Sequence, residues 1–397
     1  VEIARGTVSR LRTQISEWQR IGLRLSEAFF PLAEETLAQF LKAATLSKDP
    51  VQQQALAQSA IDLAVRASVE LCDCYSQQAL EARKQSEGRL ATLQGIEIGA
   101  EKTAKIRPAI DKAFNLICVP SDLGAVETSS GKTDFSAFDE HVDWAHRQSK
   151  KVCVGPLVDF TKGNLPQWIV LLNEGFDIVL KIACEHAQKC VERYRGKAHI
   201  WNCAAGLNTR GDMHWTDEQT LRMAVAIIET VRRADDRSPV LLTIDQPWSE
   251  YLRKDDDGIS PLHFADALIR ADLGLSGLAL DLRFGEDNGD SFQRDPIEIS
   301  RLIDRWAMLG LPLMIQLSSP TSDGPKDSWQ TPETCRGRVD PQTIVKLLLS
   351  KPSVHAVIWT QLADPVDGSS ISGMWDASGN PKPVLEELTE LRNKFLH

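Results

Sequence analysis

The N-terminal part of the chain carries apolar side chains at helical spacing and shows no strand pattern. Apolar residues recur at every third or fourth position over 8–18 and again over 56–74, as in an amphipathic helix. Between these stretches, Asp49 is a good helix N-cap and Pro50 suits the first helical position. The pattern predicts an all-α helical hairpin over residues 1–93.

After this segment the pattern changes to short apolar runs that alternate with helical segments, which is typical of βαβ units. The runs are 95–100, 114–119, 151–159, 199–206, 240–247, 275–284, 312–319 and 355–363. Eight strands with helices between them predict an α/β fold, a (β/α)₈ TIM barrel over residues 94–397. A doubly wound open sheet is the alternative, but no Gly-rich phosphate loop follows the first run.

The helices of this second region have clear start and stop signals. A capping box is expected from Thr216 and Gln219, and Gly310 suits the left-handed residue after a helix. Three more helices are expected to begin where a capping side chain precedes a proline. These dipeptides are Ser260-Pro261, Asp295-Pro296 and Asp340-Pro341.

Composition narrows the function classes. Of 397 residues, 42% are hydrophobic and 25% are charged, which is ordinary for a globular protein. The formal net charge is −10 and Lys and Arg form no dense block, so we expect neither nucleic-acid nor membrane binding. No apolar run approaches the roughly 20 residues that a bilayer span requires.

The cysteines and histidines indicate no metal or cofactor site. The eight cysteines have no paired metal spacing, and the eight histidines form no HExxH motif. Cys118, Cys153 and Cys203 fall inside expected strands, where a free thiol acts as a small buried hydrophobe. Free core thiols favour a reducing, cytoplasmic location.

Several short motifs in the second region resemble one enzyme family. They are Asp134-Phe135-Ser136, Val142-Asp143-Trp144-Ala145, Leu165-Pro166-Gln167-Trp168, Gly310-Leu311-Pro312 and Gly379-Asn380-Pro381-Lys382-Pro383. In order and spacing they are similar to family 10 of the glycoside hydrolases, the endo-β-1,4-xylanases. The resemblance covers residues 94–397 and implies a barrel that receives a carbohydrate or related polyol.

The same resemblance also implies a change of chemistry. The family cleaves xylan with retention, using an acid/base glutamate and a nucleophilic glutamate about 5 to 5.5 Å apart. The acid/base glutamate ends the fourth strand and aligns with Gly206, and the nucleophile in the seventh strand aligns with Leu317. We therefore expect a barrel that binds carbohydrate without the family's hydrolysis.

Polar and aromatic residues near the carboxyl ends of the expected strands are candidates for holding this ligand. Barrel active sites lie at that end of the strands, and a tryptophan face packs against the C–H face of a sugar. The candidates are Asp159, Asn202, Gln246, Trp248, Arg283, Gln316, Trp359, Gln361 and Trp375.

An active hydrolase with relocated carboxylates is the second hypothesis. Asp245 or Glu250 would act as acid/base, and Asp281 or Glu286 as nucleophile. In the alternative interpretation Asp281 and Arg283 form a structural ion pair, and the two glutamates are solvated loop charges.

A third hypothesis gives the function to the helical hairpin. Its long apolar stripe could pair with another copy of the chain or with an upstream domain, so that the protein acts as a scaffold. Alternatively, residues 1–93 pack on the barrel and have no partner of their own.

Overall fold

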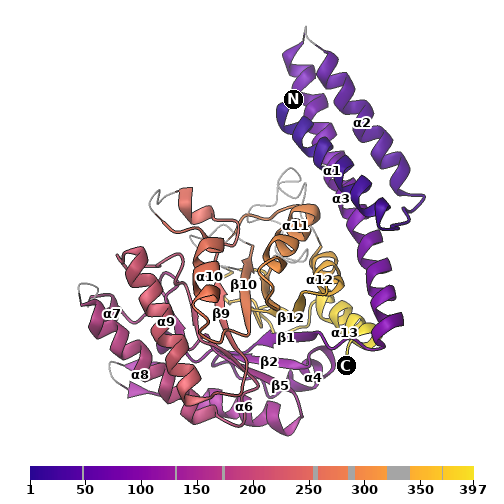
Figure 1. Ribbon diagram of the computed structural model, residues 1–397. Coiled ribbons are helices and arrows are strands. Elements are labelled where there is room, and N and C mark those ends of the chain that lie inside the picture. The colour runs from indigo at the N-terminus through magenta and orange to yellow at the C-terminus, as the bar shows by residue number, and fades with distance from the viewer. Residues whose placement is uncertain are drawn as a thin grey trace. The chain divides into compact units, whose positions relative to one another are not determined.

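The computed structural model describes residues 1–46, 49–129, 132–171, 175–253, 258–284, 291–319, 340–368 and 370–397. Their contacts divide the chain into two compact units (Figure 1). The first unit holds Val1–Leu90 with Gln293–Asp304 and Thr321–Pro352, and the second holds Ala91–Phe292, Arg305–Pro320 and Ser353–His397.

A closed barrel of eight parallel strands is the centre of the second unit (Figure 1), so the predicted fold class is confirmed. The strands close in the order β1-β12-β11-β10-β9-β7-β5-β2. Their bounds are β1 (Leu93–Glu97), β2 (Leu116–Val119), β5 (Lys151–Val154), β7 (Ile200–Asn202), β9 (Val240–Ile244), β10 (Gly277–Arg283), β11 (Leu313–Ser318) and β12 (Val354–Trp359).

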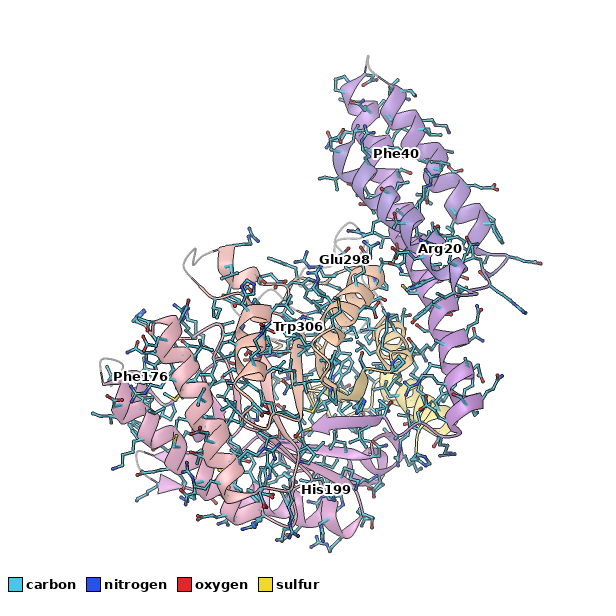
Figure 2. The ribbon with its side chains drawn as sticks, in the orientation of Figure 1. Arg20, Phe40, Phe176, His199, Glu298 and Trp306 are labelled. Atoms are coloured by element: carbon cyan, nitrogen blue, oxygen red, sulfur yellow. The ribbon has the colours of Figure 1, made fainter. Side chains whose placement is uncertain are left out.

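Each barrel strand is followed along the chain by a helix. These helices are α4 (Arg107–Ala113), α6 (Ser136–Arg147), α8 (Phe176–Tyr194), α9 (Asp217–Ala234), α10 (Pro261–Arg270), α11 (Pro296–Ala307), α12 (Pro341–Ser350) and α13 (Pro383–Phe395). In Figure 2, Phe176 opens α8 and Trp306 lies near the end of α11. The Phe176 ring meets Trp215 edge-on at 5.5 Å, and Trp306 is fully buried.

The expected helix starts are confirmed, and of the expected caps only the side chain of Asp340 makes no capping hydrogen bond. Thr216 and Gln219 form the capping box, and Gly310 has a φ of +78°. Helices α10, α11 and α12 begin at the three expected prolines. The side chain of Ser260 accepts the backbone N–H of His263.

Two of the expected strands are each split in two. The run 151–159 contains β5 and β6 (Val158–Asp159), and the run 199–206 contains β7 and β8 (Ala204–Ala205). Pro156 has no N–H to donate and so interrupts the first run. β6 and β8 form a short parallel pair of their own.

Short elements complete the second unit. They are α5 (Leu123–Val126), the antiparallel pair β3 (Glu127–Ser129) and β4 (Lys132–Thr133), α7 (Gln167–Val170) and the 3₁₀ helix η1 (Glu250–Arg253). Within the described ranges, no helix combines the length and the apolar composition needed to cross a bilayer.

Strand alternation determines which side chains face the inside of the barrel. Leu241, Ala279 and Met314 belong to one buried cluster in the barrel. Because successive side chains of a strand point to opposite faces, residues two positions further on face the same way. Thr243, Asp281 and Gln316 occupy these positions, so the interior becomes polar toward the carboxyl ends of the strands.

The N-terminal segment is all-α, as expected of a helical hairpin or bundle, and it consists of three helices. They are α1 (Glu2–Arg20), α2 (Phe29–Thr45) and α3 (Pro50–Glu87). The break comes after α1, where Gly22 adopts a φ of +100° and the N–H of Leu23 bonds the carbonyl of Trp18, an arrangement that ends a helix. The break between α2 and α3 was expected at Asp49-Pro50. Asp49 caps α3 by accepting the N–H groups of Val51 and Gln52.

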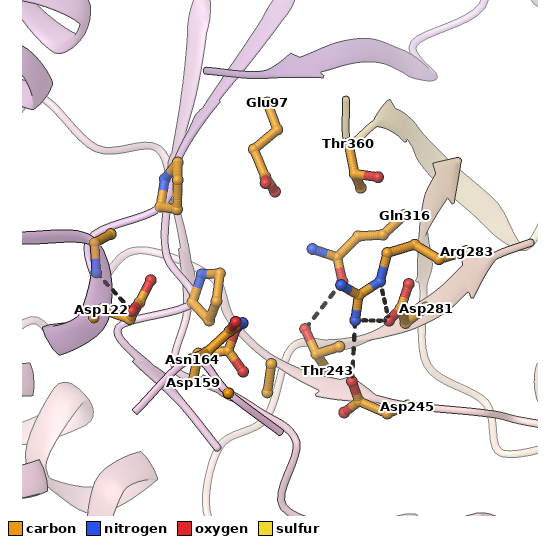
Figure 3. Close-up of a pocket in the computed structure, with 16 residues that line it drawn as sticks. Glu97, Asp122, Asp159, Asn164, Thr243, Asp245, Asp281, Arg283, Gln316 and Thr360 are labelled. Carbon is orange, nitrogen blue, oxygen red and sulfur yellow. Dashed lines mark hydrogen bonds and ion pairs between the residues drawn. The ribbon is translucent and has the colours of Figure 1, made fainter. Parts of the chain in front are cut away.

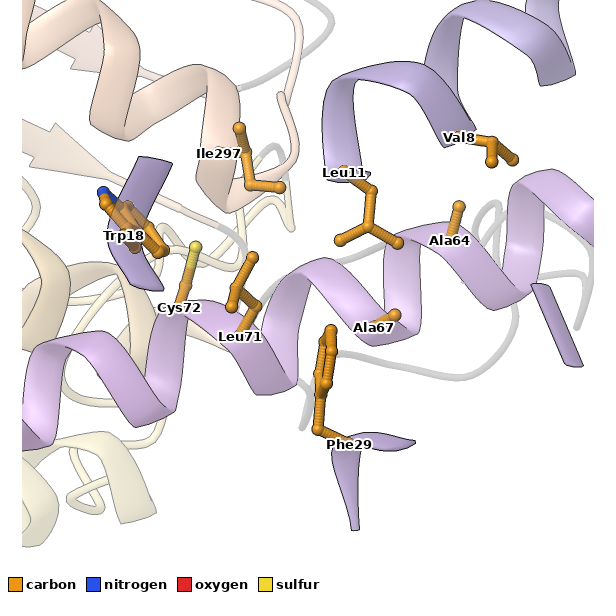
Figure 4. Close-up of a cluster of buried hydrophobic side chains, with 9 residues drawn as sticks. All are labelled: Val8, Leu11, Trp18, Phe29, Ala64, Ala67, Leu71, Cys72 and Ile297. Atoms are coloured by element: carbon orange, nitrogen blue, oxygen red, sulfur yellow. The ribbon is translucent and has the colours of Figure 1, made fainter. Parts of the chain in front are cut away.

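Apolar side chains of these three helices pack inside the first unit. Leu11, Phe29 and Leu71 are buried in one cluster with Ile297 of α11 (Figure 4). An ion pair between Arg10 and Asp295, with 2.8 Å between its nitrogen and oxygen, lies in the same unit. Part of the helical apolar stripe is therefore already covered by the chain itself.

Candidate functional site

A cavity of about 390 Å³ lies at the carboxyl ends of the barrel strands (Figure 3). Its volume is within the usual range for a small-molecule site. The polar and charged side chains that line it are Glu97, Asp122, Asp159, Asn164, Thr243, Asp245, Asp281, Arg283, Gln316 and Thr360. Of the sequence candidates, it brings together Asp159, Asp245, Asp281, Arg283 and Gln316.

The barrel strands themselves position these side chains. Glu97 is the last residue of β1, and Asp281 and Arg283 occupy alternate positions of β10. Thr243 lies in β9 and Asp245 directly follows that strand. Parallel strands end at the same edge, so these residues meet although they are far apart in the sequence.

Arg283 holds two of the carboxylates. Its Nη2 atom lies 2.5 Å from Oδ2 of Asp281 and 3.8 Å from Oδ1 of Asp245, and its Nε atom donates to Asp281 at 2.7 Å. The ion pair between Asp281 and Arg283, one of the two interpretations of the sequence, is present.

Each of these two aspartates keeps one oxygen without a hydrogen bond from the described residues. Asp245 accepts the backbone N–H of Gly206 on Oδ2 at 2.6 Å. Its Oδ1 and the Oδ1 of Asp281 accept none, although the residues are only 3% and 5% exposed. Buried polar atoms are normally hydrogen-bonded; here the guanidinium of Arg283 lies beside both acids, with its Nη2 atom 3.8 Å from Oδ1 of Asp245.

Burial and mutual repulsion raise the pKa values of three lining acids. Burial raises the pKa of Glu97 to about 8, with Arg283 opposing the shift and Asp159 adding to it. The pKa of Asp122 rises to about 7 through burial and the nearby Asp159. Burial and Asp281 raise the pKa of Asp245 to about 7. Protons therefore remain on part of this cluster near neutral pH.

Neutral polar groups form the floor of the cavity. The Nδ2 of Asn202 donates to Thr243 Oγ1 at 2.8 Å, and Thr243 Oγ1 lies 3.2 Å from Oε1 of Gln316. Asn202 is fully buried and does not line the cavity. At the rim, Asp159 accepts the side-chain amide of Asn164 at 2.6 Å.

The residue aligned with the acid/base glutamate has no room for a side chain. Gly206 adopts a φ of +73°, a conformation that L side chains rarely adopt. A Cβ atom placed there would lie 2.1 Å from the backbone nitrogen of Thr161. A glutamate could be accommodated only if the backbone moved.

The residue aligned with the nucleophile faces away from the cavity. Leu317 has no exposed surface and is not part of the cavity lining, whereas its neighbour Gln316 is. Side chains alternate along β11, so Gln316 is the residue that this strand presents to a ligand.

The remaining candidates lie outside the cavity lining. Gln246, Trp248 and Glu250 follow β9, and the Trp248 ring is 6.1 Å from that of Phe284. Glu286 lies outside the described residues.

The other three candidates lie at β12 and beyond it. Trp359 and Trp375 are each 2% exposed, and the Trp359 indole donates to the carbonyl of Ser372 at 2.7 Å. Gln361 accepts the hydroxyl of Ser370. All three remain outside the lining.

Sequence reasoning missed several lining residues, among them Glu97 and Asp122. The first strand was expected over 95–100, which placed Glu97 in its middle, but β1 ends at Glu97. Asp122 resembles an ordinary helix cap, and it does accept the backbone N–H of Ala125. In the described part of the chain, no three His, Cys, Asp or Glu side chains are arranged to hold a metal ion.

Comparison with known sequences gives a partial match. No family model matches the chain. Endo-1,4-beta-xylanase B of Humicola insolens is 31% identical over 80 residues, which are 20% of this chain and 21% of that protein. The chain therefore spans about a fifth of the length of this curated relative.

Comparison with solved structures covers most of the chain. The family 10 glycoside hydrolase of Paenibacillus barcinonensis has a TM-score of 0.57 at 16% identity, over 80% of this chain and 97% of that one. Xylanase 10B of Thermotoga petrophila, solved in complex with xylobiose, has a TM-score of 0.56 at 16% identity, over 79% and 97%.

The family 10 xylanase of Thermobacillus composti is similar, with a TM-score of 0.54 and 17% identity over 79% of this chain and 99% of that one. Identities this low show the fold alone. The chain thus has the barrel fold of the family 10 xylanases, as the sequence motifs indicated.

Proposed function

We propose that this protein binds a carbohydrate at the mouth of its barrel and does not hydrolyse it by the retaining mechanism. The observation that carries the proposal is the backbone at Gly206, which excludes a side chain where the family's acid/base glutamate would stand. Carbohydrate binding requires neither of the family's two glutamates, so a barrel can keep binding while it lacks hydrolysis.

The cavity is suited to a polyol. Among the described residues that line it, five carry carboxyl groups, and carboxylate oxygens accept hydrogen bonds from sugar hydroxyls. Thr243 and Gln316 add neutral polar groups that can both donate and accept. The similar xylanase of Thermotoga petrophila was solved with xylobiose, which agrees with a sugar ligand.

The groups at the mouth do not suit retaining hydrolysis. β11 presents Gln316, and an amide cannot attack an anomeric carbon as a carboxylate does. Asp245 and Asp281 both contact the same Arg283 nitrogen. With the guanidinium bound between these acids, neither is free to act as nucleophile.

An inverting pair made of Asp245 and Asp281 is disfavoured by the same contacts. The Oδ1 of Asp245 and the Oδ2 of Asp281 can be no farther apart than the sum of their 3.8 Å and 2.5 Å distances to Nη2. That sum is below the roughly 6.5 Å at which inverting carboxyl pairs begin.

Titration calorimetry with xylobiose tests the binding half of the proposal. We expect saturable binding by the wild type and about tenfold weaker binding by Asp281→Asn, which loses a charge-assisted acceptor. Asp266→Asn is the matched control, because this aspartate pairs with Arg270 on the exposed side of α10. Absence of binding to xylobiose and to other β-linked disaccharides would refute the proposal.

A relocated hydrolase is the second candidate, and the raised pKa of Asp245, about 7, favours it because a general acid must keep its proton near neutral pH. Under this alternative, aryl glycosides are cleaved and Asp245→Asn abolishes the cleavage. Under the proposal preferred here, the wild type and Asp245→Asn are equally inactive.

A further inference from the structure

The acids of the cavity are unevenly compensated. Among the described lining residues there are five carboxylates and one cationic side chain, that of Arg283. Arg283 contacts Asp281 and Asp245. In Figure 3, Asp122 lies across the cavity from Arg283, and Glu97 lies at its upper edge. Arg283 acts on Glu97 and Asp159 only at longer range, so the side of the cavity away from Arg283 carries more acidic groups than this one cation compensates.

Three acids, Glu97, Asp122 and Asp159, form this acidic side of the cavity. Asp159 accepts the N–H of Thr161 and the amide of Asn164, which are neutral donors. Asp122 likewise accepts a backbone N–H. For Glu97, the charge of Arg283 opposes the rise in pKa that burial causes but does not cancel it.

Burial makes this arrangement of acids unfavourable as long as no further positive charge lies near them. Asp122 is 6% exposed and Asp159 9% exposed, so water screens their charges poorly. An uncompensated buried carboxylate is costly unless it binds a proton or a cation. Protons compensate part of the cluster near neutral pH, and a cationic group of a ligand in the cavity would replace them as the source of positive charge.

We propose that the ligand is a sugar-sized polyol with a protonated amine, such as an amino sugar, whose ammonium group lies among Glu97, Asp122 and Asp159. The inference rests on the proposed carbohydrate-binding function and adds the chemical class of the ligand. An ammonium group supplies one positive charge and three hydrogen-bond donors, whereas a hydroxyl in its place supplies no charge.

Arg283 sets the orientation of this ligand. Its guanidinium repels an ammonium group, so the amine lies on the opposite side of the cavity. The hydroxyl groups then lie on the Arg283 side of the cavity, beside Thr243 and Gln316. Each end of the ligand thus faces groups with which it can form hydrogen bonds.

The proposal also predicts proton release. The pKa values of Glu97 and Asp122 are raised to about 8 and about 7, so both acids are partly protonated near neutral pH. An adjacent ammonium favours the ionised forms and lowers these pKa values. At a pH where the free amine is fully protonated, its binding therefore releases protons, and binding of a neutral sugar does not.

The test compares two disaccharides that differ only in this kind of group. The β-1,4-linked dimer of glucosamine and cellobiose share a skeleton, and the first has an amine at C2 of each ring where the second has a hydroxyl. We expect calorimetry to show the glucosamine dimer binding about tenfold tighter or more. Titrations in two buffers of different ionisation enthalpy are expected to show proton release for that dimer alone.

Two variants test whether the preference for the amine over the hydroxyl arises in the cavity. Glu97→Gln and Asp122→Asn each remove one acid of the acidic side, and we expect each to reduce the amine preference severalfold and to reduce proton release. Glu229→Gln is the matched control, because this glutamate is exposed on α9 away from the cavity and its loss leaves both quantities unchanged.

The outcomes separate this inference from the function on which it rests. Equal binding of the two disaccharides overturns the amine proposal and leaves carbohydrate binding intact. If no disaccharide binds, both proposals fail. Binding of 1,4-diaminobutane as tight as that of the glucosamine dimer also overturns the inference, because the cavity would then recognise an amine without a sugar.

Discussion

The backbone N–H of Gly206 donates a hydrogen bond of 2.6 Å to Oδ2 of Asp245. Gly206, which the sequence resemblance is expected to align with the family's acid/base glutamate, thus presents a backbone donor, and the carboxylate of Asp245 at the neighbouring strand end accepts from it. Because Gly206 has a φ of +73° and a side chain there would meet the backbone of Thr161, the glycine is required by the local structure.

Gly206→Ala is expected to lower the free energy of unfolding by about 3 kcal/mol, since it adds a backbone clash to the cost of a left-handed alanine. Gly196→Ala is the matched control. Gly196 has a φ of +83° with no atom within 4 Å of an added Cβ, so about 1 kcal/mol is expected. Urea denaturation measures both, and equal losses would show that the predicted clash is absent.

Arg283→Met is expected to destabilise the protein by about 2 kcal/mol. This is less than the roughly 3–5 kcal/mol of a fully buried pair, because the Arg283 side chain is 35% exposed. Arg222→Met, which breaks the exposed pair with Asp177, is expected to cost about 0–1 kcal/mol. Thermal or chemical denaturation of the two variants side by side provides the comparison.

Stability is expected to depend on the proton of Glu97. Its pKa rises from an ordinary value of 4.5 to about 8 in the folded protein, so the folded state holds the proton more tightly. The resulting stability is complete below the ordinary pKa and is lost as the pH rises through the folded value.

The amide of Glu97→Gln does not titrate, so the variant lacks this pH-dependent loss. Its stability relative to the wild type should therefore increase as the pH rises from about 4 to about 8. Urea denaturation across that range measures the difference. Glu229→Gln, on the exposed face of α9, should track the wild type at every pH. A constant difference between Glu97→Gln and the wild type would show that Glu97 ionises normally.

Leu71→Ala tests the packing of the first unit. Leu71 is fully buried in the cluster with Phe29 and Ile297, and we expect a loss of about 3 kcal/mol by calorimetric or chemical unfolding. Val51→Ala removes an aliphatic side chain from a position that is 79% exposed, so it should change stability little. Similar effects of the two variants would contradict the packing described here.

Most of the fold could be predicted from the sequence. Apolar runs and capping residues are local signals, and pairs such as Thr216 with Gln219 act over one helical turn. The exceptions were also local. Pro156 divided one expected strand, and Gly22 ended α1 inside a segment with helical spacing.

The site was predicted less completely, because a site depends on which side chains of distant strands face one another. Alignment placed Leu317 at the nucleophile position, but only the barrel shows that Gln316 faces the cavity. Glu97 was missed because its strand was expected to continue beyond it. The tryptophans at 359 and 375 had the right residue type for sugar stacking, yet both are buried away from the lining.

The most direct test of the account is the release of chromophore from an aryl β-xylobioside by the purified chain, followed to long times at an enzyme concentration where xylobiose binding is saturable. We predict binding without release above the buffer rate, and the same result for Asp245→Asn. Steady release by the wild type that disappears in Asp245→Asn would contradict the account, since it would show that the barrel has rebuilt a catalytic pair.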